Sequence, residues 1–497
     1  MLSTRTLLAS ICLTALCSTA RTRTPTAARP HIVLIVTDDQ DIEAYGLQAM
    51  AKTNALLRDR GAFFNNAFVT TPICCVSRSS ILTGKYAHNL RVYNNTRHGN
   101  CGGRRWRRRD ERKTIASYLH GVGYSTFYAG KYLNTYGKKS EEAGVPPGWD
   151  WWNGLVGNSR YYNYSLVVNE TVERHGDGVD DYLTTVIAQR AKRFIAEMSA
   201  SGRPLFLMLC PPAPHAPYTS AVQYEHEFAN ASAPRTVAFD RAASDKHWLV
   251  AVKQKMSPHT TRVVDLAYRN RLRTLLSVDD LVEAVVAALD SAHILDNTFI
   301  VYTSDNGYHT GQFRLPLDKR QPYEFDVRVP LIVRGPGVPQ AAVHDDVALN
   351  IDLLPTIAEW ARVGAAAVDA DGLSLASLLA NGTAMGRNHF LIEYWGEAGR
   401  AIQGSCSQTA DSGEAQCVPE VDCACFDARN NTYACVRQLN HRHDTVYCRF
   451  SDDVGFEESY NLRADPHQLV NRIDEMSATE KRKLRRELTK LRSRRGR

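Results

Sequence analysis

HIVLIVTDDQ, residues 31–40, is a continuous apolar run that ends abruptly in two aspartates. A short run of β-branched residues without polar alternation is typical of a strand buried on both faces, as in a parallel sheet. Residues 204–218, PLFLMLCPPAPHAPY, repeat the pattern and end in a proline-rich loop. Residues 297–312, NTFIVYTSDNGYHTGQ, and residues 329–337, VPLIVRGPG, repeat it again. These stretches are predicted to be buried strands.

Helical patterns lie between the strands, at residues 181–198 and 277–295. Ser277 is the predicted N-cap of the second helix, because Asp280 follows three residues later, as in a capping box. Strands that alternate with helices predict an α/β fold with a mainly parallel sheet flanked by helices.

The character of the chain changes after about residue 375. Cysteines cluster there, and DTVYCRF (444–450) and EESYNL (457–462) resemble antiparallel strands. We therefore predict a main domain at residues 28–375 and a smaller α+β, cysteine-rich domain at residues 376–497, closed by a basic helical tail.

Polar residues follow the predicted strands at their carboxyl ends, where the side chains of an α/β sheet converge on one crevice. They are Asp38, Asp39, His215, Asp305 and Asn306. The two aspartates at one strand end and the Asp305–Asn306 pair at another supply only oxygen ligands. Oxygen donors suit calcium or magnesium, and calcium tolerates irregular geometry. The alternative is that the two adjacent aspartates only cap a following helix.

The N-terminus predicts export. Residues 1–20, MLSTRTLLASICLTALCSTA, combine an early arginine, a short apolar stretch and small residues suited to signal peptidase. The apolar stretch is too short to span a membrane, and no later segment has the length of a transmembrane helix. We expect the secretory pathway, with a lysosomal or a secreted destination.

Six N-x-S/T sequons agree with export, because several sequons behind a signal peptide favour luminal or extracellular residence. They begin at Asn94, Asn163, Asn169, Asn230, Asn381 and Asn430.

Ten cysteines remain after the signal, and six of them crowd near the end of the chain. Their spacing lacks paired C-x-x-C knuckles and the compartment is oxidising, so disulfides are favoured over zinc. The six are Cys406, Cys417, Cys423, Cys425, Cys435 and Cys448.

The formal charge of +7 is unevenly distributed. RRWRRRDERK (104–113) and KRKLRRELTKLRSRRGR (481–497) hold much of the excess. One interpretation is a solvated face and a frayed terminus. The other is attraction to a polyanion, with stacking on Trp106. In an exported protein that partner is an acidic glycan rather than nucleic acid.

Two cysteines are adjacent in TTPICCVSRSSILTGKY (70–86). Neighbouring Cα atoms lie ~3.8 Å apart, below the usual disulfide range of ~4.4–6.8 Å. A bridge between Cys74 and Cys75 is therefore not expected. A soft thiolate also fits poorly beside a hard-cation site, so another chemistry is expected for one of them.

CCVSRSSILTGKY resembles the sulfatase signature C-x-P-S-R-x-x-x-L-T-G, whose first cysteine is oxidised to formylglycine by the formylglycine-generating enzyme. Counting back from Arg78 places that position at Cys74. Segments across nearly the whole chain look like the N-acetylglucosamine-6-sulfatase branch: GKYLNTYG (130–137), APHAPYTSAVQY (213–224), DKHWL (245–249), SDNGYHTGQFRLPLDKRQPYEFDVRVPLIVRGPG (304–337) and DARNNTYACVRQLNHRHDTVYCRF (427–450).

The resemblance implies an alkaline-phosphatase-like fold and a sulfatase mechanism. The aldehyde at residue 74 would be hydrated; one hydroxyl attacks sulfur, and the other expels sulfate by re-forming the aldehyde. Arg78 would support the formylglycine, and either His215 or Lys319 would protonate the leaving alcohol. The implied sets are Asp38, Asp39, Asp305, Asn306 and modified Cys74 around one calcium ion; Lys131, His215 and Lys319 around the sulfate; and His247 in the substrate pocket.

Two positions depart from the signature. Val76 stands where the modifying enzyme reads a proline, and Leu133 stands where many sulfatases have a histidine, although GKYLN also occurs in the glucosamine-6 branch. The leading hypothesis is an exo-acting sulfatase that removes 6-O-sulfate from glucosamine residues of heparan or keratan sulfate. The alternatives are an arylsulfatase-like enzyme with another sulfate ester, and a catalytically silent glycan-binding protein.

Overall fold

A computed structural model describes residues 28–44, 46–138, 144–397 and 418–493. The predicted signal peptide lies outside the described residues, as do Cys406 and Cys417. Within the described residues, none of the helices combines the length and the apolar character needed to cross a membrane.

The strands are β1 His31–Thr37, β2 Ala62–Phe64, β3 Ala67–Phe68, β4 Ser125–Lys131, β5 Trp151–Leu155, β6 Ser165–Val168, β7 Thr171–Arg174, β8 Leu205–Cys210, β9 Thr298–Ser304, β10 Leu331–Arg334, β11 Ala342–His344, β12 Ala348–Leu349, β13 His389–Tyr394, β14 Tyr433–Leu439, β15 Asp444–Phe450 and β16 Glu457–Asn461. The helices are α1 Ala51–Thr53, α2 Cys74–Thr83, α3 Ala87–Leu90, α4 Ile115–Gly121, α5 Leu183–Met198, α6 Trp248–Ala251, α7 Pro258–Ser291, α8 Glu324–Val327, α9 Leu353–Trp360, α10 Ala376–Asn381 and α11 Ala478–Ser493.

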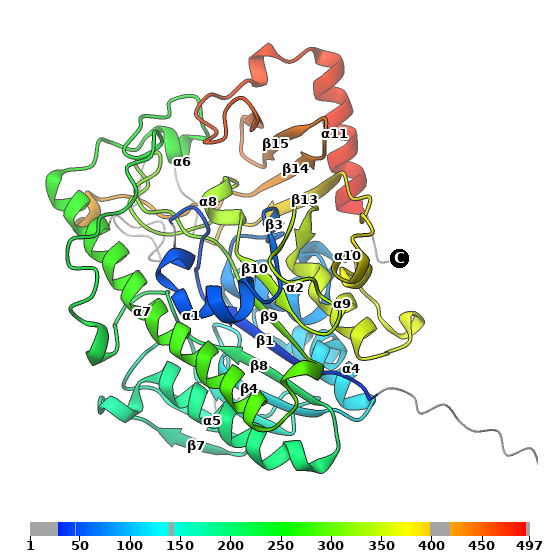
Figure 1. The fold of residues 1–497 in the computed structure, drawn as a ribbon. Coiled ribbons are helices and arrows are strands. Elements are labelled where there is room, and N and C mark those ends of the chain that lie inside the picture. The colour runs from blue at the N-terminus through cyan, green and yellow to red at the C-terminus, as the bar shows by residue number, and fades with distance from the viewer. Residues whose placement is uncertain (1–27, 45, 139–143, 398–417, 494–497) are drawn as a thin grey trace, which may run out of the picture.

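The main sheet has the strand order β11-β2-β10-β9-β1-β8-β4-β5-β6-β7 (Figure 1). Its centre, from β9 through β1, β8 and β4 to β5, is parallel. β10 pairs antiparallel with β9, and the segment that joins them, residues 305–330, contains the short helix α8. The predicted α/β fold with a mainly parallel sheet is confirmed.

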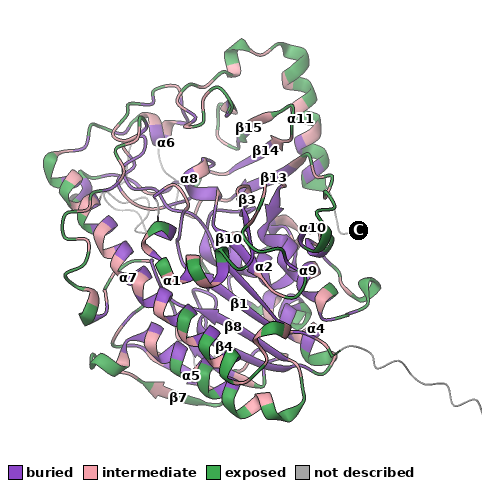
Figure 2. Cartoon of the chain, viewed as in Figure 1, coloured by how far each residue is buried: buried purple, intermediate pink, exposed green. Residues whose placement is uncertain are grey.

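β1 is buried on both faces, as its apolar run predicts (Figure 2). Ile32, Leu34 and Val36 join one core cluster, whereas Val33 and Ile35 join the other. The first cluster includes residues of α2, α4 and α9, and the second includes residues of α5 and α7. The sheet is therefore a layer between two sets of helices, which leaves the loops at its carboxyl edge to form a site.

The prediction that a helix begins at Ser277 is wrong. α7 begins at Pro258 and continues without a break to Ser291, and its N-cap is Ser257, whose hydroxyl accepts a hydrogen bond from the Thr260 amide at 3.1 Å. Ser277 lies inside the helix. Proline in the first turn marks the true start, since its missing N–H costs nothing there.

The predicted strands 444–450 and 457–462 are confirmed as β15 and β16 of a four-stranded antiparallel sheet, β13-β14-β15-β16. α11, the predicted basic helical tail, buries Leu488 and Leu491, and it lies against this sheet in Figure 1. One core cluster runs from the main sheet into the small one, since Leu34 of β1 and Tyr433 of β14 both belong to it. The division at residue 375 stays a prediction.

The position of the α7 N-cap can be tested with two serine substitutions. Ser257→Ala should lower the free energy of unfolding by about 1 kcal/mol, because it removes the cap of the first turn. Ser277→Ala should change that free energy by less than about 0.5 kcal/mol, since alanine suits a helix interior. Urea unfolding followed by circular dichroism measures both. An equal loss in the two variants would contradict this helix boundary.

Candidate active site

The predicted site residues come from separate segments that meet at the carboxyl edge of the sheet. Asp38 and Asp39 follow β1, Lys131 ends β4, and Asp305 follows β9. Cys74 is the first residue of α2. One ligand atom each from Asp38, Asp39, Cys74 and His215 lies within 4.8 Å of the others. The structure thus brings together residues that are far apart in the chain.

The Asp38 carboxylate accepts three hydrogen bonds from two side chains. The Lys131 ammonium donates to its two carboxylate oxygens at 2.9 and 2.7 Å, and the Ser159 hydroxyl donates to Oδ2. Burial alone would raise the pKa of Asp38, but the nearby cations, Lys131 first, hold that pKa well below its usual value. Glycine is required at position 130, next to Lys131, because its φ is +109° and a Cβ there would lie 2.0 Å from the Cys210 carbonyl oxygen of the neighbouring strand.

Asp39 lies in the left-handed region, at φ +70°, which an aspartate tolerates better than most residues. Its carboxylate accepts two hydrogen bonds from the Lys319 ammonium, both at 2.6 Å, and its amide donates to Asp305 Oδ1 at 3.0 Å. Asp318 and Arg320, on either side of Lys319, also have positive φ. Backbone strain of this kind often accompanies functional sites.

Arg78 is buried in the same cluster. Its Nε donates to Asp305 Oδ2 at 2.7 Å, its Nη1 donates to the Lys131 carbonyl at 2.9 Å, and its Nη2 lies 3.7 Å from Asp38 Oδ1. Burial nevertheless raises the pKa of Asp305 to about 7, against the opposing effect of Arg78. The protein's own cations therefore compensate the charge of Asp305 only in part.

The donor set of this cluster fits a hard cation. Three carboxylates and one amide are available, and the amide oxygen of Asn306 is buried without a hydrogen-bond partner among the described residues. Its amide nitrogen instead donates to Asp39 Oδ1 at 2.7 Å. Carboxylate and amide oxygens are ligands that calcium and magnesium prefer.

Cys74 is fully buried at the N-terminus of α2, and its Sγ lies 3.8 Å from Asp39 Oδ1. Burial raises the pKa of this thiol. The thiolate is the nucleophilic form of cysteine, so the unmodified side chain is poorly suited to attack at neutral pH. The helix N-terminus favours negative charge at this position.

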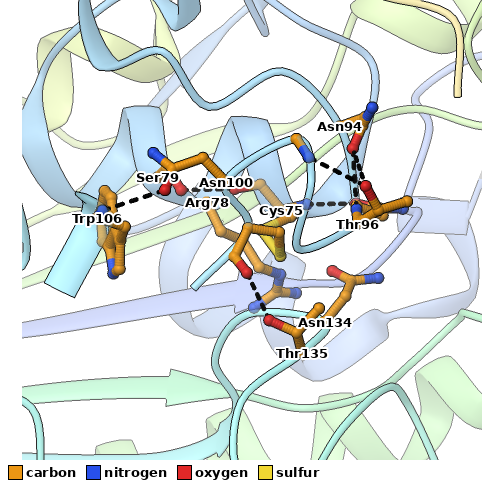
Figure 3. The surroundings of a disulfide bond; sticks show 12 residues. Cys75, Arg78, Ser79, Asn94, Thr96, Asn100, Trp106, Asn134 and Thr135 are labelled. Atoms are coloured by element: carbon orange, nitrogen blue, oxygen red, sulfur yellow. Dashed lines mark hydrogen bonds between the residues drawn. A yellow bond between two sulfur atoms is a disulfide. The ribbon is translucent and has the colours of Figure 1, made fainter. Parts of the chain in front are cut away.

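Cys75 forms a disulfide with Cys101, and Figure 3 shows the surroundings of Cys75. Cys74 and Cys210 carry free thiols. The Cys75 amide also donates to Asn95 Oδ1 at 2.9 Å. The prediction that Cys74 and Cys75 do not pair is confirmed. Of the C-terminal cysteines, Cys435 pairs with Cys448, and Cys423 and Cys425 are disulfide-bonded as well.

His215 and His247 occupy different surroundings. His215 Nε2 lies 3.8 Å from Asp39 Oδ2, and burial lowers its pKa, which favours a neutral ring. His247 is buried against the C-terminal sheet, stacked on Phe450 at a centroid distance of 4.1 Å, with Asp452 3.5 Å away. Those contacts explain its burial, and its assignment to the substrate pocket stays a prediction.

Two residues of the site escaped the sequence analysis. Ser159, which donates to Asp38, lies in a loop without any recognisable motif. Arg271 of α7 is buried and donates to the Asp39 carbonyl at 2.8 Å and to Asp41 Oδ2 at 2.9 Å. Arg271 could have been recognised as an arginine in the apolar stripe of a helix, but the predicted helix began at Ser277 and did not include it.

The six sequon asparagines remain candidates for glycosylation. Four of them are exposed, and Asn94 and Asn430 are partly exposed. The exposed ones are Asn163, Asn169, Asn230 and Asn381.

The sulfatase family profile matches residues 30–363. The fold and the charged site therefore define a class of sulfuric ester hydrolases, and the chain belongs to the sulfatase family. The N-acetylglucosamine-6-sulfatases of goat (Capra hircus) and human (Homo sapiens) are each 46% identical to it over 451 residues, which is 89% of this chain and 80% and 81% of theirs.

A solved structure of a protein in complex with its substrate, D-glucosamine-2-N,6-O-disulfate, superposes with a TM-score of 0.71. The superposition covers 93% of this chain and 97% of that chain at 21% identity, a likeness that shows the fold alone.

The disulfide assignment can be tested by peptide mapping and by mutation. Non-reducing mass spectrometry should find Cys75 linked to Cys101 and position 74 in no disulfide. Cys75→Ala/Cys101→Ala should lower the free energy of unfolding by about 3 kcal/mol, because the bridge closes a loop across a sequence separation of 26. Cys210→Ala, which removes a free buried thiol, is the control and should lower the free energy of unfolding by a smaller amount. A Cys74–Cys101 link would contradict the assignment.

Proposed function

We propose that the protein is an exo-acting sulfatase that hydrolyses the 6-O-sulfate ester of N-acetylglucosamine or glucosamine residues in heparan or keratan sulfate. The observation that carries this proposal is the buried cluster in which Cys74 adjoins Asp38, Asp39 and His215. The names of the goat and human relatives support the choice of sugar and of sulfate position.

The reacting group in this proposal is a formylglycine derived from Cys74 by the formylglycine-generating enzyme. Its hydrate supplies one hydroxyl that attacks sulfur and a second that allows sulfate to leave. The raised pKa of the unmodified thiol supports the need for modification. The position at the N-terminus of α2 favours the negative charge that develops there.

The protein's cations are assigned to the sulfate. Lys131 and Lys319 are buried, and although burial alone would lower the pKa of each, the neighbouring aspartates raise it, so both stay charged. Fixed positive charges that are held before reaction stabilise the charge developing on the sulfuryl oxygens. Arg78, anchored on Asp305, holds α2 in register with β9 and positions residue 74.

The proton for the leaving alcohol is assigned to His215 or Lys319. Lys319 carries a proton, but its raised pKa makes it a weak acid, whereas His215 is neutral and must first take a proton. The His215 ring is fixed at Nδ1 by the Ala216 carbonyl, 2.6 Å away, which leaves Nε2 facing the cluster.

One calcium ion is proposed as cofactor, held by Asp38, Asp39, Asp305, Asn306 and the modified side chain at residue 74. The orphan amide oxygen of Asn306 supports this assignment. When bound, the cation supplies a Lewis acid that polarises the sulfate and acidifies the attacking hydroxyl.

The proposed location is the secretory pathway, with delivery to lysosomes or release from the cell. The exposed sequon asparagines and the disulfides support it, since disulfides persist in oxidising compartments.

The activity can be tested with two sulfate esters. The secreted protein should release sulfate faster from 4-methylumbelliferyl N-acetylglucosamine-6-sulfate than from 4-methylumbelliferyl sulfate, because a sugar pocket adds binding energy that an aryl ester cannot use. Cys74→Ala should release none from either. Preference for the aryl ester would favour an arylsulfatase-like enzyme, and no release from either would favour a silent glycan-binding protein.

Peptide mass spectrometry of residue 74 completes this test. We expect formylglycine in the secreted protein and a larger converted fraction in Val76→Pro. Proline is compatible with this position because the first i→i−4 bond of α2 is donated by Ser77, one residue later. Only unmodified cysteine in both preparations would contradict the proposed chemistry.

Calcium should also stabilise the folded protein. At a free calcium concentration about 100-fold above Kd, binding adds about 2.7 kcal/mol to the free energy of unfolding. Adding calcium to the EDTA-treated protein should therefore raise its Tm. Asn306→Leu, which removes one oxygen ligand and keeps the branched shape of the side chain, should reduce the calcium-induced shift. Scanning calorimetry measures both, and an unchanged Tm on adding calcium to the EDTA-treated protein would rule out this cofactor assignment.

A further inference from the structure

The basic run 104–113 forms a compact helical segment rather than a loose loop. Residues Trp106–Asp110 form a π-helical turn and Glu111–Lys113 a 3-10 turn. Trp106 is fully buried, and its indole N–H donates to Glu111 Oε1 at 3.1 Å. The expected stacking of a glycan on Trp106 is therefore wrong, because the ring is inside the core. It serves instead as the anchor of the segment.

Three arginines of this segment form a stripe on the surface. Arg104, Arg108 and Arg112 are exposed, and none of them forms a hydrogen bond or an ion pair with another residue in the described part of the chain. They recur at every fourth residue through the helical turns of the segment, so that three exposed arginines lie within nine residues of chain. Like charges at this spacing destabilise a helix. We call these three residues the arginine ridge.

The nearby acids do little to neutralise the ridge. Asp110 and Glu111 are buried, and burial raises the pKa of both. Lys113 and Arg109 have acidic neighbours, Asp369 at 3.5 Å and Asp110 at 3.7 Å, whereas the ridge has none at that distance among the described residues. The charge of Arg112 does act on Glu111, whose pKa it lowers, but none of the three arginines forms an ion pair with a described residue. Within the described part of the chain the ridge therefore presents net positive charge to solvent.

The ridge is covalently tied to the reacting residue. Cys101, three residues before Arg104, is bonded to Cys75, with Cα atoms 5.9 Å apart, and Cys75 adjoins Cys74 (Figure 3). The length of extended chain between these atoms limits the distance from the Cys74 Cα to the Arg104 Cα to about 20 Å. The Thr135 hydroxyl also donates to the Cys101 carbonyl at 2.5 Å, which fixes the segment to the loop after Lys131.

A polar hollow of about 190 Å³ lies between the segment and the end of β4. Arg107, Tyr132, Thr135 and Tyr136 are among its lining residues. Tyr132 directly follows Lys131 in the chain, so the hollow lies between the basic segment and the loop that leaves β4.

We propose that the arginine ridge is a secondary binding site for the sulfated glycan chain, which holds sulfate and carboxylate groups of sugars beyond the one that is desulfated. Guanidinium groups bind sulfate and carboxylate oxygens through paired N–H donors. The inference rests on the proposed function for the identity of the chain that is bound. The ridge acts on affinity for long substrates and takes no part in chemistry.

The experiment compares two triple variants with equal loss of charge. Arg104→Gln/Arg108→Gln/Arg112→Gln removes the ridge, and Lys483→Gln/Arg486→Gln/Lys490→Gln removes three exposed charges from α11, which packs on the C-terminal sheet. Binding of a heparan sulfate hexasaccharide is measured by calorimetry in 0.15 M NaCl, with Cys74→Ala added to every protein so that binding is measured without turnover.

Loss of the ridge should raise Kd about tenfold, since each of three exposed charge pairs contributes about a factor of two. The α11 variant should change Kd by less than about twofold. Equal effects of the two triples would overturn the proposal in favour of diffuse attraction by net charge, and no effect of the ridge variant would overturn it outright. If the ridge variant lost binding to phosphatidylserine vesicles but bound the hexasaccharide as before, the ridge would be a membrane-binding site, and the proposal would also be overturned.

Kinetics with Cys74 intact separate this inference from the proposed function. The ridge variant should raise KM for the hexasaccharide about tenfold and leave kcat unchanged, because the lost contact is equal in the ground state and the transition state. The monosaccharide ester should be hydrolysed as before. If the unaltered protein desulfates neither substrate, the proposed function fails, and the calorimetry alone decides whether the ridge binds the glycan.

Discussion

The site depends on the burial of like and unlike charges at the carboxyl edge of the parallel sheet. Three carboxylates and three cations are almost fully excluded from water there: Asp38, Asp39, Asp305, Arg78, Lys131 and Lys319. Moving one ion out of water costs several kcal/mol unless a partner compensates it. The ends of these strands must therefore come together during folding, so that each buried charge has a partner. The charges that are assigned to the chemistry thus also fix β1, β4 and β9 relative to α2.

The same burial supports the proposed modification of Cys74. A thiol in this position is neutral, since burial opposes its ionisation more strongly than Lys131 and Lys319 favour it. The neighbouring disulfide removes Cys75 from competition by pairing it with Cys101. Of the two adjacent cysteines, Cys75 is thus structural and Cys74 remains available to the site. Val76, the next residue, is buried on the first turn of α2.

The sequence predicted the parts of the fold that depend on local pattern. The apolar run 31–37 ends in Asp38 because a strand buried on both faces excludes charge until it leaves the sheet. The start of α7 was missed because Pro258 and Ser257 precede a stretch rich in polar residues, whereas Ser277 resembles a cap within the apolar part of the helix.

The contacts of Ser159 and Arg271 could not be predicted, since each is joined to the cluster only by tertiary packing. Trp106 was misjudged for a related reason: its neighbours in sequence are arginines, but its neighbours in space are apolar residues and Glu111.

The burial of Trp106 bears on the proposed glycan binding, because an anchored ring leaves Arg104, Arg108 and Arg112 exposed. The protein then holds two kinds of positive charge. Buried cations are screened little by salt, and in the proposed function they act on the sulfate that reacts. The exposed arginines are screened over a Debye length of about 8 Å at physiological ionic strength and act on groups that contact them. If both proposals hold, a polyanionic chain is bound by the exposed arginines and released as salt rises, while the chemistry at residue 74 stays unaffected.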